Sequence, residues 1–231
     1  MTLPELSIHF SNHDDAARAV DDVVRAEAAG VRRVWLSEDL FHRGAMPIAA
    51  AALALTKTVE IAFGVLAPQH RHPASVAMDL RSLIEIGGGR ILVGLGAGVS
   101  ERGALVGKPA SPPLRIVDDA VFAVRTLLQG EELTQDGVLH ESRGLSLTGP
   151  PTTGVPPVYV AAVGPKALAQ GGSRMDGVVL TMMCSQEHAR WAAGEVASAA
   201  SAAGREGVPV VVYLPIAVDA DGAKARARMR Q

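Results

Sequence analysis

The sequence predicts an α/β fold of the TIM (β/α)8 type, on three observations. Short apolar runs rich in β-branched residues alternate with stretches of helical period along the whole chain of 231 residues. These runs are apolar nearly throughout, as parallel strands covered on both faces require. The first βα turn lacks the Gly-x-Gly-x-x-Gly of a dinucleotide-binding sheet, which favours a barrel over an open doubly wound sheet.

The apolar runs define seven strands. They span residues 6–10, 34–37, 59–66, 90–95, 158–162, 177–181 and 210–218. The first helix, 14–29, places Ala16, Ala19, Val20 and Val23 on one face at the spacing of an amphipathic helix. The remaining predicted helices span residues 47–57, 73–86, 115–128, 165–171, 186–203 and 223–231.

Glycine and proline mark the ends of these helices. Gly30 follows the first helix, Pro47 and Pro73 suit the first turns of the second and third, and three glycines at 87–89 close the third. Each boundary therefore has a local chemical cause as well as a change of period.

Residues 96–157 interrupt the alternation. Apart from the helix at 115–128, this stretch carries a small hairpin or extended excursion at 130–147, so we interpret it as an insertion between strands four and five. We expect a single barrel domain over 1–231. Seven strands are one fewer than the barrel needs, so either the last βα unit is absent from the C-terminus or the insertion holds a further strand.

Composition excludes several classes of protein. The chain has 22 Lys and Arg against 24 Asp and Glu, which leaves no positive surplus for binding nucleic acid. The single cysteine, Cys184, forms no internal disulfide, and the histidines show no metal-ligand spacing beyond the weak pair His70 and His72. The start lacks the pattern of a signal peptide, and no apolar run reaches the roughly 18 residues of a membrane span. These features predict a cytoplasmic protein without a bound metal.

Polar residues gather after the predicted strands, where parallel barrels carry their chemistry. Glu38 and Asp39 directly follow the second strand, and burial that raises a carboxyl pKa towards neutrality makes a general acid or base. The alternative is that one of them caps the next segment or pairs with Arg43.

Two further motifs at these strand ends suit a phosphate-bearing cofactor. Gly94, Gly96 and Gly98 alternate after the fourth strand and let backbone amides approach a ligand. Gly164 and Pro165 open a helix whose N-terminus, beside Lys166, favours an anion.

The order of these motifs carries a resemblance. Residues 34–39 (VWLSED), 71–73 (RHP), 88–90 (GGR), 94–98 (GLGAG) and 164–166 (GPK) occur in the order found in bacterial luciferase-like oxidoreductases. Within that superfamily the chain is most similar to the branch that uses the deazaflavin coenzyme F420, related to methylenetetrahydromethanopterin reductase.

The resemblance implies a TIM barrel that binds F420, or alternatively FMN, across its mouth. It also implies a cis peptide bond at Gly64–Val65, a homodimer formed through the second and third helices, and hydride transfer to a small organic substrate. The implied cofactor contacts are Gly64, Val65, Gly94, Gly96, Ala97, Gly98, Ala162, Val163, Gly164, Pro165 and Lys166.

The resemblance also implies where the proton is handled, and here the chain departs from the family. Relatives often hold Asp-His after strand two, whereas this chain holds Glu38 and Asp39, which become its candidate catalytic residues. Two alternatives remain: an FMN-dependent monooxygenase, and a truncated non-catalytic flavin-binding protein.

Overall fold

The computed structural model describes residues 5–11, 15–108, 111–149 and 154–230. Its order of elements confirms the predicted alternation of strands and helices. The chain divides into two compact units, Met1–Ala161 and Ala162–Gln231.

The first unit is built on five parallel strands in the order β1-β2-β3-β4-β7. Their bounds are Ile8–Phe10 (β1), Arg33–Leu36 (β2), Glu60–Phe63 (β3), Ile91–Leu95 (β4) and Val158–Ala161 (β7). The register places Trp35 of β2 beside His9 of β1 and Ala62 of β3. Because parallel neighbours end at the same edge, the loops that follow β2, β3 and β4 lie together there.

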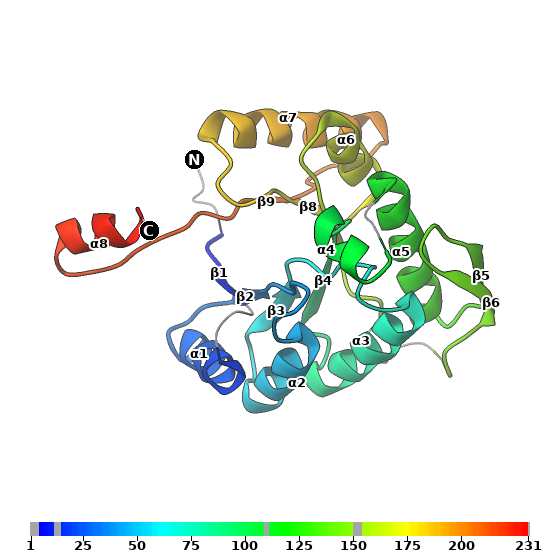
Figure 1. Cartoon of the computed structure of the whole chain (residues 1–231), viewed down its shortest axis with the longest axis horizontal. Helices are drawn as coiled ribbons and strands as arrows, with labels where there is room; N and C mark the ends of the chain where they lie inside the picture. Colours follow the sequence, from blue (N-terminus) through cyan, green and yellow to red (C-terminus); the bar gives the residue numbers. More distant parts are fainter. Residues whose placement is uncertain (1–4, 12–14, 109–110, 150–153, 231) are drawn as a thin grey trace. The chain divides into compact units, whose positions relative to one another are not determined.

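The longer helices of the first unit lie around the outside of these strands (Figure 1). The bounds of this unit's helices are Ala16–Ala28 (α1), Ala45–Leu55 (α2), Pro73–Gly87 (α3), Ser100–Leu105 (α4) and Pro113–Leu128 (α5). Strands β5 (Leu133–Asp136) and β6 (Glu141–Leu145) form an antiparallel hairpin, as predicted for 130–147. Apolar side chains such as Trp35 and Phe63 are buried and drive the packing of this unit.

The second unit pairs β8 (Gly177–Val179) with β9 (Val210–Val211) in parallel. Its helices are α6 (Pro165–Arg174), α7 (Gln186–Ala202) and α8 (Gly222–Arg228). Leu168, Val178, Leu180 and Val196 belong to its core cluster, where α6 packs on α7. None of the helices within the described residues is both long and apolar enough to cross a membrane.

The structure differs from the prediction in several details, of which three matter most. The last predicted strand, 210–218, is too long: β9 ends at Val211, and Leu214, Ile216 and Val218 are exposed. Helix α4 was not predicted, because its six residues are too few to show a helical period. Helix α2 begins at Ala45, two residues before the proline taken as its first turn.

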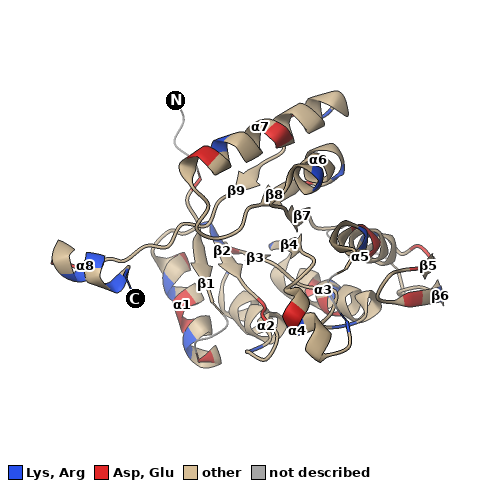
Figure 2. Cartoon of the chain, turned by 45° about the horizontal axis from the view of Figure 1, so that its top comes forward, with Lys and Arg blue, Asp and Glu red and all other residues tan. Residues whose placement is uncertain are grey.

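Helix α2 carries no charged residue, in contrast to α1, where blue and red segments alternate in Figure 2. Its C-terminal carbonyl groups are held by Arg90, which precedes β4. The guanidinium donates to the carbonyl oxygens of Leu53 and Thr56 at 3.0 Å each and of Val59 at 2.7 Å. A cation thus faces the negative end of the helix dipole and satisfies carbonyls that the helix leaves unpaired.

Glu27, at the end of α1, holds the start of β3 in a similar way. Its Oε1 accepts hydrogen bonds from the backbone amides of Lys57, Thr58 and Val59 at 2.6 to 2.9 Å, and from the Thr58 hydroxyl. The Thr58 amide lowers the pKa of Glu27 most, partial burial opposes it, and the other donors bring the pKa to about 2. The carboxylate is therefore a charged anchor between α1 and β3.

Replacing Glu27 with glutamine is expected to lower the urea midpoint of unfolding at pH 7, since the amide oxygen is a weaker acceptor for four donors. The pKa is lower in the folded state than its usual 4.5, so the benefit is complete above pH 4.5 and is lost as pH falls towards 2. Midpoints measured from pH 7 to 3 test this. The difference in urea midpoint between the wild type and Glu27→Gln should narrow below pH 4.5. A difference that does not change with pH would contradict a charged Glu27.

Candidate active site

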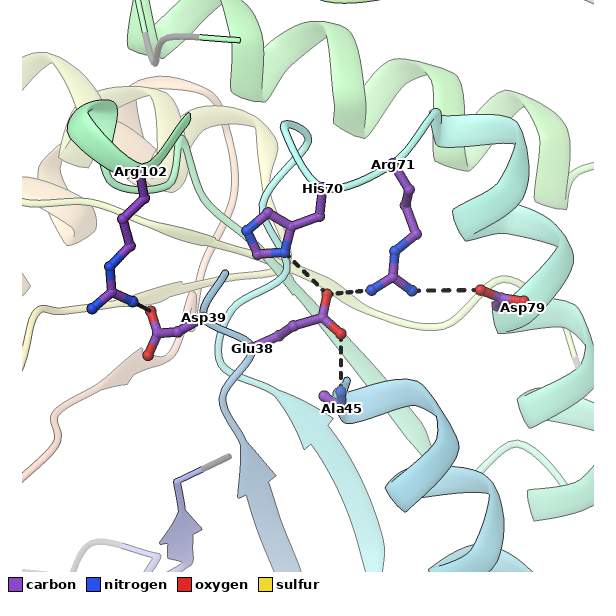
Figure 3. Close-up of polar contacts among 7 residues, drawn as sticks. All are labelled: Glu38, Asp39, Ala45, His70, Arg71, Asp79 and Arg102. Atoms are coloured by element: carbon purple, nitrogen blue, oxygen red, sulfur yellow. Dashed lines mark hydrogen bonds and ion pairs between the residues drawn. The ribbon is translucent and has the colours of Figure 1, made fainter. Parts of the chain in front are cut away.

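Glu38 is the buried centre of a polar cluster at the carboxyl edge of the first unit's sheet. It lies just beyond β2 and is 8% exposed. Its Oε2 accepts from the amide of Ala45 at 2.9 Å, and its Oε1 accepts from Arg71 and faces Nδ1 of His70 at 3.3 Å (Figure 3). His70 and Arg71 come from the loop between β3 and α3, so adjacent parallel strands bring the three side chains together.

The electrostatics of Glu38 differ from the expectation for a general acid. Burial raises the pKa of Glu38, but the hydrogen bond from His70, the charge of Arg71 and the amide of Ala45 lower it more, so the net direction is downward. The expectation that burial brings this carboxyl near neutrality is therefore wrong, because three donors face it. Glu38 is an ionised acceptor, and the alternative that it caps the next helix is confirmed by its bond to Ala45.

Asp39 points away from this cluster and pairs with Arg102 on α4, with Oδ1 and Nη1 3.2 Å apart (Figure 3). Both side chains are about two-fifths exposed, at 40% for Asp39 and 38% for Arg102. The two candidate carboxylates thus sit in different settings: Glu38 is buried and multiply bonded, and Asp39 joins the loop after β2 to the segment that follows β4.

The peptide bond between Gly64 and Val65 is cis, as the resemblance implied. It lies beside Gly94 and Gly96 of β4 and its following loop. A Cβ at Gly94 would meet the carbonyl oxygen of Phe63, and one at Gly96 would meet Val65 Cγ2 at 2.6 Å and Ala161 Cβ at 3.0 Å. These two glycines are thus required by packing within the protein, whatever ligand their backbone approaches.

Gln69 shapes the rest of this glycine loop. The side chain is 4% exposed, and its amide donates to the carbonyl oxygen of Ala97. Gly98 has a φ of +72°, and a Cβ there would lie 2.7 Å from Gln69 Oε1. Gln69, which the sequence reading did not single out, therefore holds Ala97 and Gly98 in place.

The other implied cofactor residues belong to the second unit. Ala162 is buried and Val163 is exposed, and both lie between β7 and α6. Gly164 precedes α6, Pro165 occupies its first turn, and no side chain caps this helix end. A Cβ built on Gly164 meets nothing within 4 Å. The N-terminus of α6 within this unit is therefore open, with free amides of the kind that bind phosphate.

His70 and His72 bond to different partners. His72 caps α3, where its Nδ1 accepts from the Ala74 amide at 3.1 Å, and its Nε2 lies 3.1 Å from the carbonyl oxygen of Glu141 on β6. Across the residues that the structure describes, no group of three or more His, Cys, Asp or Glu is placed to hold a metal ion. His70 contacts Glu38, whereas His72 caps the first turn of α3.

His9 on β1 is a further histidine near Asp39. Burial lowers the pKa of His9, and the negative charge of Asp39 acts in the opposite direction. The net shift keeps this imidazole neutral at neutral pH.

A hollow of about 430 Å³ opens at the other end of the strands, away from these residues. Most of its charged side chains already have partners: Arg33 bonds Glu60 at 2.5 Å and approaches Glu5 at 3.8 Å, and Glu27 holds the start of β3. We therefore place the chemistry at the carboxyl edge, where Glu38 and His70 lie, and not in this hollow.

Comparison with known proteins shows the family of the chain. A family model described as luciferase-like monooxygenase matches residues 2–231. The 5,10-methylenetetrahydromethanopterin reductase of Methanolobus tindarius is 29% identical over 221 residues, covering 95% of this chain and 67% of the relative. The F420-dependent glucose-6-phosphate dehydrogenase of Beutenbergia cavernae is 34% identical over 170 residues, covering 68% of this chain and 50% of the relative. The chain thus spans between half and two thirds of these relatives.

Solved structures show the same fold. The coenzyme F420 dependent tetrahydromethanopterin reductase of Methanopyrus kandleri has a TM-score of 0.86 at 20% identity, covering 96% of this chain and 68% of that one. The oxygenating constituent of 3,6-diketocamphane monooxygenase of Pseudomonas putida, in complex with FMN, has a TM-score of 0.77 at 19% identity, covering 93% and 66%. The α/β fold predicted from the sequence therefore matches luciferase-like TIM-barrel folds.

Proposed function

This chain belongs to the luciferase-like monooxygenase family, and we propose that it is an oxidoreductase that exchanges a hydride between coenzyme F420 and a small organic substrate. The observation that carries the proposal is the identity of its relatives: curated proteins matching up to 95% of the chain are F420-dependent reductases and dehydrogenases. FMN-dependent monooxygenation is the second candidate, favoured by the FMN complex among the structural neighbours.

The residues present fit a phosphate-bearing cofactor. The uncapped N-terminus of α6, with Gly164, Pro165 and Lys166, offers amides, a helix dipole and a positive charge to a phosphate. Within the first unit we assign the ring system to the segment around Gly64 and Val65, with further contacts at Gly94, Gly96, Ala97 and Gly98. Ala162 and Val163 stay predicted contacts of the second unit.

Bound F420 supplies the hydride chemistry, and the chain's own residues bind and orient the substrate and manage a proton. Glu38 is ionised and accepts three hydrogen bonds, so its contribution is to fix neighbouring donors. Asp39, paired with Arg102, joins α4 to the loop after β2.

Equilibrium titration with F420 and, separately, with FMN tests the cofactor by fluorescence. We expect F420 to bind more tightly, and Lys166→Ala to weaken it about fivefold, the effect of a partly exposed charge contact of about 1 kcal/mol. Lys224→Ala, which removes an exposed lysine of α8, is the matched control and leaves binding unchanged. A folded protein that binds neither cofactor would contradict both catalytic functions. Binding without turnover would favour the non-catalytic alternative.

The exposed face of α2 and α3 supports a homodimer. Helix α2 is apolar on all sides, and yet its Leu55 is 64% exposed to solvent. Helix α3 also exposes two apolar side chains, Met78 and Ile86. Helices that are apolar all round are normally buried, so we propose that a second copy of the chain covers this face. Sedimentation analysis should give a dimer that Met78→Glu dissociates, whereas a monomer at every concentration would refute the interface.

A further inference from the structure

Glu38, the buried carboxylate after β2, is not suited to release a proton near neutral pH. Glu38 is surrounded by three donors that favour its ionised form, and Asp39 is paired with the guanidinium of Arg102. Hydride transfer to a carbonyl or to a carbon–nitrogen bond nevertheless requires a proton at the oxygen or nitrogen. The group that exchanges it has to be sought among the neighbours of Glu38.

His70 is the neighbour with the required chemistry. Its side chain is 11% exposed, and its Nδ1 lies 3.3 Å from Glu38 Oε1. An ionised carboxylate only accepts hydrogen bonds, so Nδ1 of His70 carries the hydrogen and donates it. In the neutral ring this leaves Nε2 as a free base.

The position of Nε2 agrees with this role. It lies on the side of the ring facing away from Glu38, as Figure 3 shows, and no protein group in the described part of the chain bonds it. Arg71 and the Ala45 amide hold the carboxylate from its other sides, so the orientation of the imidazole is determined by a rigid acceptor. A carboxylate that fixes the tautomer of a histidine in this way is a recurrent arrangement in acid–base catalysis.

We propose that His70 is the acid–base residue of this site and that Glu38 is its positioning residue, an inference that rests on the proposed function. In the reducing direction the hydride's electron pair forms the new C–H bond. The electron pair of the C=O or C–N bond moves to the oxygen or nitrogen, and the imidazolium gives its Nε2 proton to that atom. Neutral His70 remains, still bonded to Glu38 through Nδ1, and it recovers a proton from water; oxidation runs the same steps in reverse.

Imidazole ¹⁵N spectra of the apoprotein at pH 8 test the geometry without any substrate. We expect His70 to carry its hydrogen on Nδ1 in the wild type and to lose that preference in Glu38→Gln, while His42, an exposed histidine before α2, is unchanged. A wild-type His70 protonated on Nε2, or a tautomer unaffected by Glu38→Gln, would overturn the proposal.

Turnover tests the chemistry, with F420 and glucose 6-phosphate or with reduced F420 and methylenetetrahydromethanopterin, the substrates named by two relatives. We expect His70→Ala to lower kcat at least about 100-fold while the F420 Kd changes less than about threefold. Added imidazole should restore part of the rate, which a merely structural role would not allow. Glu38→Gln should lower kcat about 10- to 100-fold with little change in KM, as loss of an orienting carboxylate does.

The results distinguish a failure of the acid–base proposal from a failure of the cofactor assignment. His42→Asn should leave kcat unchanged, and a His70→Ala protein as active as the wild type would refute the acid–base role. A wild type that binds no F420 while its His70 keeps the expected tautomer would reject the proposed function and retain the Glu38–His70 arrangement.

Discussion

Replacing Gly94 with alanine is expected to lower the free energy of unfolding by about 3 kcal/mol, the upper range for overpacking a core. The new Cβ would meet the carbonyl oxygen of Phe63, and Val65 Cγ1 lies 3.0 Å from the same point. Both atoms belong to the segment beside β4. The carbonyl oxygen is part of the backbone and cannot move aside as a side chain can. Urea unfolding followed by circular dichroism measures the change.

A graded series of glycines in the same unit controls for the general cost of adding a methyl group. Gly96→Ala meets the end of the Val65 side chain, which gives more easily, so about 1 to 2 kcal/mol is expected. Gly44→Ala makes an ordinary contact with Pro47 Cδ at 3.5 Å and should cost about 1 kcal/mol or less. Equal losses for the three variants would show that close packing against β3 is not the cause.

Glu38→Ala is the second change with a large expected effect, a loss of about 3 to 5 kcal/mol, because it leaves Arg71 and the Ala45 amide without their buried acceptor. The adjacent residue is the control: Asp39→Ala removes a half-exposed ion pair and should cost about 0 to 1 kcal/mol. Urea unfolding at pH 7 compares the two neighbouring carboxylates directly. Similar losses would contradict the buried cluster.

The stability contributed by Glu38 should also depend on pH. The pKa of Glu38 is lower in the folded protein than its usual 4.5, so its contribution is complete above pH 4.5 and fades as pH falls through the folded value. The stability gap between wild type and Glu38→Ala should therefore shrink from pH 4.5 downward. A gap that widens in acid would show that Glu38 is held in its protonated form.

The strands were the most predictable part of the fold, since apolar runs such as 91–95 and 158–161 are read directly from the sequence. The prediction was wrong about the lengths of individual strands and helices. Val210 to Val218 looks like a strand throughout, but only Val210 and Val211 pair, because ladder formation depends on a neighbour that the sequence of the segment does not contain. Helix α2 starts at Ala45 for a similar reason: its cap, Glu38, lies seven residues earlier.

The candidate site was predictable in place but not in chemistry. Glu38 could be found because it follows a strand, yet its pKa depends on His70 and Arg71, which follow the next strand. Strands β2 and β3 pair in parallel, and expecting this pairing would have indicated that the loops after them lie together. The pairing of Asp39 with Arg102 had no such signal, because it requires the short helix α4.

Helix α2 has both of its ends satisfied by residues outside it, Glu38 at the first turn and Arg90 at the last. It contains no charged side chain and no cap of its own, so as an isolated peptide it has little reason to be helical in water. In folding terms α2 is a dependent element: it gains its ends only when β2 and the start of β4 have assembled. We therefore expect the helix and the Glu38 cluster to form and to be lost together, which links the order of the site to the folding of the first unit.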